Sequence, residues 1–286
     1  MRTATQGKSA TRRGSFANGM EFLALGQGPR TALFLPGGPG SNLPEGFMLR
    51  SQQRQLRPYL DAGFTVWMLT RRRHMPLNHS VADMADDCAE LVGDQFGGRI
   101  ELVVGESYGG MIALYLAARH PDRVENVALV ACAAQVSDWA KEVDARLAHA
   151  MARGDTAGAG AAALSYLLPG ERWTWLGRLF GPILGRLATP MFASPAEDLL
   201  TELRAEQAFD ARPVLRDIAV PVLLLCGDRD RCFEPEVVQA TADAIRDCRL
   251  IWYRGRGHVA TATSRSVAGD VLAFVGTSSG QQRGTT

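Results

Sequence analysis

Six short apolar runs alternate with helical segments along most of this 286-residue chain, and that alternation most limits the folds open to it. The runs are rich in β-branched and aromatic residues, as buried strands are. They cover residues 31–35, 64–69, 100–104, 124–130, 220–226 and 250–253. Helices are expected between several of them, notably at 81–92 and 110–119. This order predicts an α/β fold whose mostly parallel sheet has helices on both faces.

The alternation stops between the fourth and fifth runs, which suggests an insertion. Residues 133–212 contain helix formers and glycine-rich breaks but no convincing strand, so we expect a helical cap (lid) there. Residues 15–132 and 213–275 then form one core domain. The polar, small-residue ends at 1–14 and 276–286 are predicted to be disordered tails.

The composition limits the classes of binding partner that we expect. A formal net charge of +1 gives no general field for gathering nucleic acid, so we expect a small-molecule substrate. No segment reaches about 18 uninterrupted apolar residues and no signal peptide is apparent, which predicts a cytoplasmic protein without membrane contact. The five cysteines contain no CxxC pair, and we expect neither a metal nor another cofactor. Nothing in the residues predicts an oligomeric state.

The strongest chemical signal is the stretch Gly105-Glu-Ser-Tyr-Gly-Gly110, which follows one predicted strand and precedes a predicted helix. It fits G-x-S-x-G, in which small residues allow a sharp turn that exposes a serine hydroxyl at a helix N-terminus. The helix dipole and free N–H groups there favour developing negative charge. Ser107 is therefore the candidate nucleophile.

A serine needs a base, and the base needs a carboxylate to orient it. His258 follows the last apolar run, in a glycine-containing loop that can turn back over the strand ends. Two aspartates, Asp228 and Asp230, follow the run 220–226. We favour Asp230 as the acid, and expect Asp228 to bond within its own turn.

A glycine-rich turn after the first run completes the candidate site. In the stretch Leu35-Pro-Gly-Gly-Pro-Gly-Ser41, Gly38 is the expected backbone donor to an oxyanion, together with the N–H of Tyr108. Phosphate binding is disfavoured because no Lys-Ser or Lys-Thr follows and the G-x-G-x-x-G spacing is absent.

With these residues, the chain resembles the α/β-hydrolase superfamily over roughly residues 20–275. The Gly37-Gly-Pro-Gly40 turn and the elbow look like the proline iminopeptidase branch, although Pro36 stands where that branch has a histidine. Iminopeptidases hold the substrate's free amino terminus with acidic groups of the cap. This cap offers Glu171, Glu197, Glu202 and Glu206, which we interpret as a solvated face.

Substrate contacts are expected from two places. The apolar stretch 173–192 of the cap suggests a lid that lines the site with Trp173, Trp175 and Phe180. Three consecutive arginines follow the run 64–69, and the first, Arg71, is a candidate for an anionic substrate group. Solvation or internal pairing of the arginine run is the favoured interpretation.

These features predict a serine hydrolase that cleaves an ester, thioester or lactone of a small hydrophobic substrate through an acyl-enzyme. The alternatives are an iminopeptidase-like aminopeptidase or amidase and a carbon–carbon bond hydrolase, since the same triad supports them, or a non-hydrolytic binding protein or lyase on the same fold.

Overall fold

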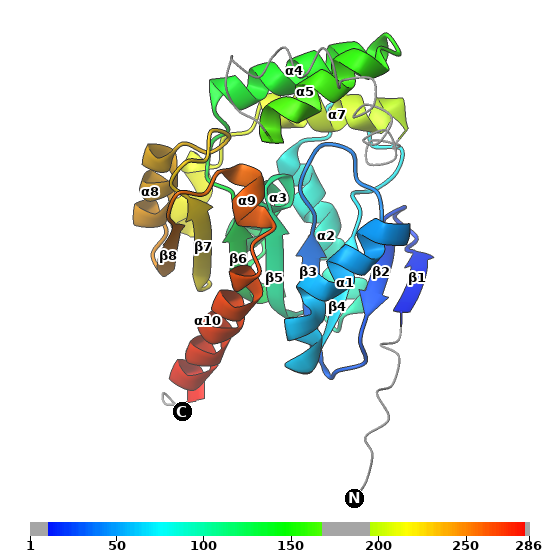
Figure 1. Ribbon diagram of the computed structural model, residues 1–286. Coiled ribbons are helices and arrows are strands. Elements are labelled where there is room, and N and C mark those ends of the chain that lie inside the picture. Colours follow the sequence, from blue (N-terminus) through cyan, green and yellow to red (C-terminus); the bar gives the residue numbers. More distant parts are fainter. Residues whose placement is uncertain (1–10, 168–194, 284–286) are drawn as a thin grey trace, which may run out of the picture.

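The computed structural model describes residues 11–167 and 195–283, in which an eight-stranded sheet lies between two layers of helices (Figure 1). The strand order is β1-β2-β4-β3-β5-β6-β7-β8. Strand β2 runs antiparallel to β1 and β4, and the other neighbouring pairs are parallel. The strands are β1 Thr11–Ser15, β2 Glu21–Leu25, β3 Arg30–Leu35, β4 Phe64–Leu69, β5 Ile100–Glu106, β6 Val124–Val130, β7 Val222–Gly227 and β8 Cys248–Tyr253. The predicted α/β-hydrolase fold with a mostly parallel sheet is confirmed.

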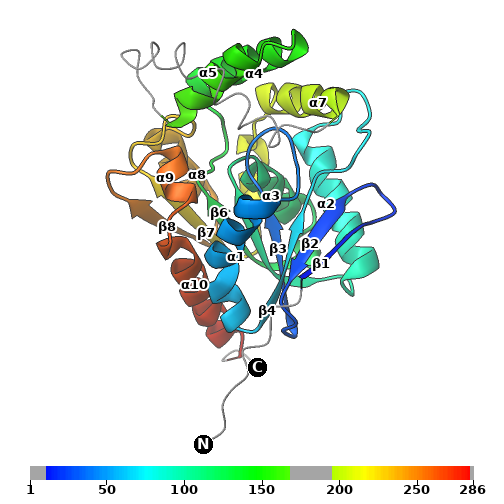
Figure 2. The same cartoon turned by 45° about the vertical axis from the view of Figure 1, so that its right-hand side comes forward.

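Helices cover both faces of the sheet (Figure 1 and Figure 2). Helices α2, α3 and α8 pack on one face, and α1 and α10 on the other. The helical elements are α1 Gly46–Asp61, α2 Val81–Gln95, α3 Tyr108–Arg119, η1 Pro121–Arg123, α4 Asp138–Ala152, α5 Thr156–Leu167, α7 Ala196–Gln207, η4 Arg212–Asp217, α8 Pro235–Ala244, α9 His258–Ala262 and α10 Ser266–Arg283.

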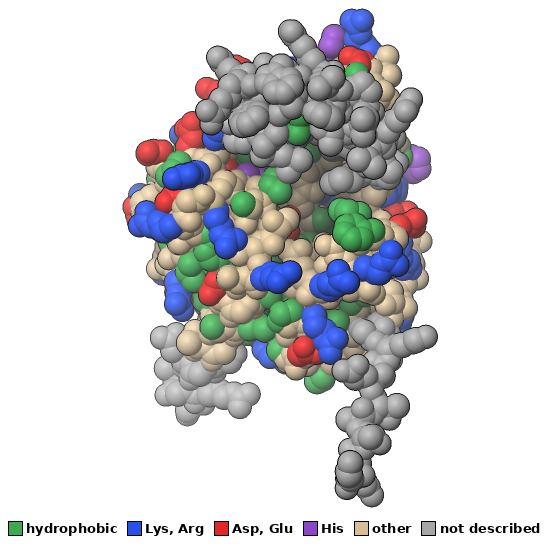
Figure 3. All heavy atoms as spheres, viewed as in Figure 1, with side chains coloured by type: hydrophobic (Ala, Val, Ile, Leu, Met, Phe, Trp, Pro, Cys, Tyr) green, Lys and Arg blue, Asp and Glu red, His purple; other side chains and the backbone are tan. Residues whose placement is uncertain are grey.

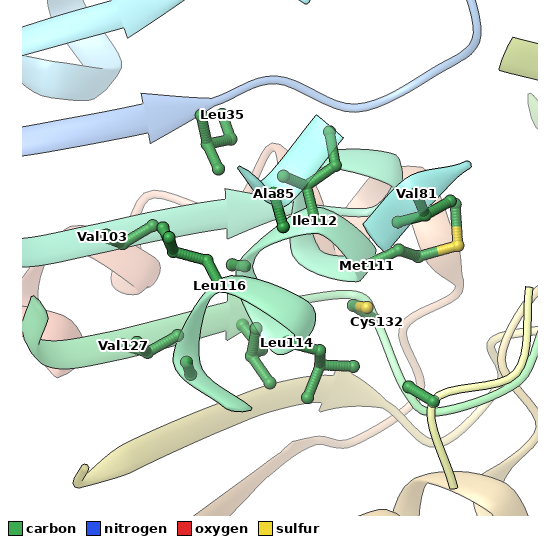
Figure 4. Close-up of a cluster of buried hydrophobic side chains, with 14 of the residues drawn as sticks. Leu35, Val81, Ala85, Val103, Met111, Ile112, Leu114, Leu116, Val127 and Cys132 are labelled. Atoms are coloured by element: carbon green, nitrogen blue, oxygen red, sulfur yellow. The ribbon is translucent and has the colours of Figure 1, made fainter. Parts of the chain in front are cut away.

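The core is centred on α3, the helix that follows the predicted nucleophile. Its side chains Ile112 and Leu116 lie in one buried cluster with Val103 of β5 and Val127 of β6 (Figure 4). Every labelled side chain there is at most 3% exposed. Close packing of this kind holds the start of α3 rigidly, because interiors tolerate little change of volume.

Helices α4, α5 and α7, all from the stretch between β6 and β7, lie together beyond the carboxyl edge of the parallel strands (Figure 1 and Figure 2). An isolated bridge between Gln135 and Asp210 joins the two chain segments that connect these helices to the sheet. The rings of Trp139 and Tyr166 meet edge to face at 5.7 Å between α4 and α5. The segment predicted to be a cap is thus helical where it is described.

The prediction of disorder through residue 14 was wrong from Thr11 onward. Strand β1 carries no buried side chain, but its backbone pairs with β2, and the Arg12 guanidinium lies 5.0 Å from the centre of the Trp67 ring. Main-chain pairing and a cation–π contact order this segment without an apolar side chain of its own.

The C-terminal prediction also needs correction, because α10 continues past residue 275 to Arg283. The small polar residues Thr277 and Ser278 donate hydroxyl hydrogen bonds to the carbonyl of Phe274, at 2.7 and 3.1 Å. Their hydroxyls are satisfied within the helix, and the buried side chains of Val271 and Phe274 anchor it against the sheet.

The face in Figure 3 shows basic side chains spread over the surface, with acidic and hydrophobic side chains between them. Among the described residues, no helix is both long and apolar enough to cross a membrane.

Candidate active site

The loop between β5 and α3 holds Ser107 in a rare backbone conformation, with φ 51° and ψ −114°. Such angles are strained for a residue other than glycine, and here the tight turn between strand and helix imposes them. A Cβ at Gly109 would lie 2.0 Å from the carbonyl oxygen of Leu35, and one at Gly105 would lie 2.6 Å from the carbonyl oxygen of Gly109. Both glycines are therefore required for the close approach of α3 to the sheet.

His258 begins α9, in the loop after β8, and its ring reaches back to the serine. Its Nε2 lies 2.9 Å from Ser107 Oγ, and its Nδ1 lies 2.8 Å from Oδ2 of Asp230. An ionised carboxylate only accepts hydrogen bonds, so Nδ1 carries the proton and Nε2 is left to accept from the serine hydroxyl. The ring is supported by stacking on Phe233, with centroids 5.9 Å apart.

Asp230 lies in the loop after β7, with its side chain fully buried. Its second oxygen, Oδ1, accepts hydrogen bonds from the backbone N–H groups of Cys232 at 2.8 Å and Phe233 at 3.2 Å. These donors hold the carboxylate in the plane that His258 needs. The structure thus brings together the three residues that the sequence nominated.

Asp228 has a different partner from the one expected. It accepts a hydrogen bond from the N–H of Gly255, at 2.6 Å, and lies 3.7 Å from the Arg254 guanidinium, rather than bonding within its own turn. Because Gly255 lies in the loop that delivers His258, Asp228 ties the loops after β7 and β8 to each other.

The turn after β3 approaches the elbow from the other side. A Cβ at Gly37 would lie 3.0 Å from Ser107 Cβ, so this turn directly adjoins the nucleophile. Gly38 has a positive φ of 76°, a conformation that glycine adopts freely. Tyr108 is the first residue of α3, and the first N–H groups of a helix have no acceptor within it. These positions suit both predicted oxyanion donors.

Arg71 does not offer its guanidinium to a substrate, contrary to its nomination as a binding residue. The residue is 5% exposed, and its Nε lies 2.9 Å from Oε1 of Glu202 on α7. Its Nη1 and Nη2 donate to the carbonyls of Pro36 and Gly38, at 3.3 and 2.6 Å. The guanidinium is thus occupied by internal partners.

The other two arginines of the run are paired as well. Arg72 lies 2.8 Å from Asp87 of α2, and Arg73 lies 2.7 Å from Glu21 of β2. Internal pairing, the favoured interpretation of this run, is what the structure contains.

Two cap glutamates interpreted as solvated are buried. Glu202 is 1% and Glu206 8% exposed, whereas Glu197 is exposed as expected and Glu171 lies outside the described residues. Both face inward because α7 packs against α4 and the core, which the mixed charge pattern of the helix does not reveal.

Glu206 forms a buried pair with Asp144 of α4. Burial raises the pKa of Asp144 to about 6, against the opposing effect of its hydrogen bond from Tyr166. Burial, reinforced by the charge of Asp144, raises the pKa of Glu206 well above its usual value. The charge of His258 also acts on Asp144, so the pair lies within electrostatic reach of the predicted catalytic base.

A third unusual carboxyl is Glu106, directly before the nucleophile. Burial raises the pKa of Glu106 to about 7, opposed by the charge of His258. No local pattern signalled this group, because the residue before the elbow serine is unconstrained in G-x-S-x-G.

Trp173, Trp175 and Phe180, predicted to contact substrate, lie outside the described residues. Among those described, Asp230, Cys232 and His258 have potential ligand atoms within 4.8 Å of one another. Two of these residues are already hydrogen-bonded to each other, with His258 Nδ1 protonated, so the cluster suits proton transfer better than metal binding.

Comparisons with known proteins agree with this architecture. A family model described as "Alpha/beta hydrolase family" matches residues 32–270. Over 161 residues the chain is 30% identical to a pimeloyl-[acyl-carrier protein] methyl ester esterase of Neisseria meningitidis, a match covering 54% of this chain. The chain spans only 50% of the length of that relative.

Two further proteins are similar over more of their length. RutD from Yersinia enterocolitica, whose name is that of a carbamate hydrolase, is 30% identical over 206 residues, which cover 69% of this chain and 70% of RutD. The crystal structure of the enol-lactonase from Burkholderia xenovorans superimposes with a TM-score of 0.69 at 22% identity. It covers 90% of this chain and 97% of the lactonase, and supports the fold alone.

Proposed function

Since this chain belongs to the alpha/beta hydrolase family, we propose that it is a hydrolase that cleaves an ester, thioester or lactone of a small hydrophobic molecule through Ser107, His258 and Asp230. The observation that carries the proposal is the continuous hydrogen-bonded line from Ser107 Oγ through both ring nitrogens of His258 to the buried Asp230. That line is what an activated serine requires.

The mechanism follows from which atom holds each proton. His258 Nε2 takes the Ser107 proton as Oγ attacks the substrate carbonyl, and Asp230 stabilises the resulting imidazolium. The N–H groups of Gly38 and Tyr108 hold the oxyanion. The imidazolium then protonates the leaving group. A water activated by the same histidine cleaves the acyl-enzyme and restores the serine.

Ester-type substrates are favoured by one sequence relative, the methyl ester esterase. Interactions with the acyl or alcohol part are proposed for Trp173, Trp175 and Phe180, and helices α4, α5 and α7 are proposed to act as the lid. A lid of this kind excludes water from the oxyanion site.

A second candidate is an iminopeptidase-like aminopeptidase or amidase, and the buried acids of the lid favour it. Glu206 and Asp144 form a carboxyl pair near His258, and each has one buried oxygen without a hydrogen-bond partner in the described structure. A protonated amine of a substrate would pair with such oxygens. Under this second proposal, the two lid carboxyls would determine whether the enzyme prefers an ester or an N-terminal amide.

The first experiment is labelling by a fluorophosphonate probe, which reacts with an activated serine. We expect the wild type to be labelled, and Ser107→Ala and His258→Ala to lose labelling by several orders of magnitude. His120→Ala is the matched control, because His120 also pairs with an aspartate, Asp86 at 2.6 Å, but lies on the C-terminal side of α3. It should label like the wild type.

A panel of esters, thioesters, lactones, prolyl amides and a carbon–carbon bond substrate on the wild type then separates the candidates. Faster turnover of esters supports the first proposal, and faster turnover of prolyl amides supports the second. A folded wild type that neither labels nor turns over any of them would overturn both and favour a binding protein.

A further inference from the structure

The turn that supplies Gly38 is held by a charge pair from outside it. Arg71, just beyond β4, directs two nitrogens at carbonyls of the turn, Nη1 at Pro36 and Nη2 at Gly38. The same guanidinium is paired with Glu202 of α7, through Nε at 2.9 Å and Nη2 at 3.0 Å. One planar group therefore links the turn to a helix of the lid.

Glu202 extends the link in two more directions. Its Oε2 accepts a hydrogen bond from the N–H of Gly40, at the far end of the turn. Its backbone carbonyl accepts a hydrogen bond from the Tyr108 hydroxyl at 2.9 Å. The Tyr108 ring lies 4.5 Å from the centre of the Arg71 guanidinium. Both predicted oxyanion donors thus belong to residues in contact with this pair, and Figure 1 and Figure 2 place α7 over the turn.

The contacts with Arg71 restrict the orientation of the Gly37–Gly38 peptide. The carbonyls of Pro36 and Gly38 belong to the peptides on either side of the Gly37–Gly38 peptide, whose N–H is the predicted donor. Two glycines without side chains would otherwise rotate freely. Pro36, at the start of the turn, has no N–H to anchor it. Because both flanking peptides are held by hydrogen bonds, the direction of the Gly38 N–H is restricted.

The pair is also buried from water. The Arg71 and Glu202 side chains are 4% and 1% exposed, so each charge depends on the other. If α7 moves away, Arg71 loses its ion pair with the Glu202 carboxylate. The Gly40 N–H loses its hydrogen-bond acceptor, which is the same carboxylate.

We propose that Arg71 and Glu202 are positioning residues that orient the oxyanion-hole turn through their own contacts with it, Glu202 reaching the turn from α7. The inference rests on the proposed function. It adds that the lid helix α7 supports the oxyanion hole in addition to covering the site. Arg71 acts through the Pro36 and Gly38 carbonyls, and Glu202 through Arg71 and Gly40.

The test compares Arg71→Lys and Glu202→Gln with Asp198→Asn. Asp198 is the matched control because it lies one turn earlier on α7, is 2% exposed, and ties the lid to the core through the N–H groups of His74 and Met75. It shares burial and lid anchoring with Glu202 but does not contact the turn. Lysine at 71 keeps a charge beside Glu202 but lacks the rigid planar set of donors that holds both carbonyls and the carboxylate in fixed directions.

Each variant is assayed with the best ester of the panel, with thermal unfolding as the check on folding. We expect Arg71→Lys and Glu202→Gln to lower kcat by roughly 10–100-fold with KM within about 3-fold, because the oxyanion forms only in the transition state. Affinity for a trifluoromethyl ketone analogue should fall in parallel with kcat/KM. Asp198→Asn keeps a side-chain oxygen that can accept from the loop at His74 and Met75, so α7 should stay in place and kcat should stay within about 3-fold of wild type.

Two outcomes would overturn the inference. Folded Arg71→Lys and Glu202→Gln enzymes with wild-type kcat would show that the turn needs no brace. An equal loss in Asp198→Asn would show that lid anchoring in general, rather than the turn, is at stake. Both are distinct from failure of the proposed function, in which Ser107→Ala would keep full turnover.

Discussion

At the residue scale, Glu106 has an unusual pKa and directly precedes the proposed nucleophile. It precedes the nucleophile in the chain and sits at the end of the central strand β5. Burial raises its pKa from 4.5 to about 7, so the carboxyl stays protonated in the folded protein at pH values where the unfolded chain has released the proton.

This difference predicts a pH-dependent stability. Below pH 4.5 Glu106 is protonated in both the folded and the unfolded state, and its contribution to stability is fully present. As pH rises through about 7 the folded protein must ionise a partly buried carboxyl, and this contribution is lost. Glu106→Gln removes this loss. We expect its advantage over wild type in free energy of unfolding to be roughly 1–3 kcal/mol greater at pH 8.5 than at pH 4, the lower figure allowing for solvent screening.

Urea titrations of both proteins at the two pH values measure the effect. Glu90→Gln, at an exposed position of α2, controls for a simple change from Glu to Gln. A Glu106→Gln advantage that is the same at pH 4 and pH 8.5 would contradict the prediction.

At this same scale the sequence predicted the three residues on the Ser107–His258–Asp230 line because each lies in a local pattern directly after a strand. It did not predict the Arg71–Glu202 pair. The two residues are 131 positions apart, and a glutamate in a charged helix has no local mark that distinguishes a buried face from a solvated one. Only the packing of α7 reveals it.

At the scale of elements, the approach of α3 to β3 depends on a missing side chain. Gly109→Ala would place a methyl group 2.0 Å from the backbone carbonyl of Leu35, and neither element can move without disturbing the core. We expect a loss of roughly 3 kcal/mol in the free energy of unfolding, together with the loss of fluorophosphonate labelling as the elbow shifts.

Gly269→Ala is the control for this substitution. It lies in α10, where an added Cβ meets nothing within 4 Å, so it should stabilise the protein by about 0.5–1 kcal/mol through helix propensity. Denaturant midpoints report both changes. A Gly109→Ala protein as stable as the wild type would mean that the close approach is not required.

Elements were predictable where side chains alone identify them. Strands β3–β8 consist of apolar runs, and their predicted positions are within two residues of the observed ones at each end. Strand β1 has no buried side chain and depends on β2, and α1 is rich in arginine and glutamine, so neither gave a clear pattern. These elements exist because a neighbour supplies backbone or apolar partners that a local pattern does not contain.

At the scale of the whole molecule, β1 covers one edge of the sheet. Its five residues are exposed and pair with β2, whose Leu23 and Leu25 belong to the core. Deleting residues 1–15 should lower Tm by less than about 4 °C, because little apolar surface is lost. It should also raise self-association, because the deletion exposes the unpaired backbone of β2.

Light scattering against protein concentration measures this effect, with Tm from circular dichroism. Arg12→Ala, which removes the cation–π contact with Trp67 but keeps the strand, is the control and should stay as dispersed as the wild type. A deletion variant that loses cooperative unfolding would instead make β1 part of the core's stability.

Helix α7 bears on how proteins of this architecture change over generations. Its Glu202 contacts Arg71, the turn at Gly40 and the Tyr108 hydroxyl, while the helix also belongs to the lid. A mutation that reshapes this helix to admit a new substrate thus also disturbs the turn beside the nucleophile. If the proposed roles hold, substitutions that widen the substrate range should slow the enzyme less in α4 and α5 than in α7.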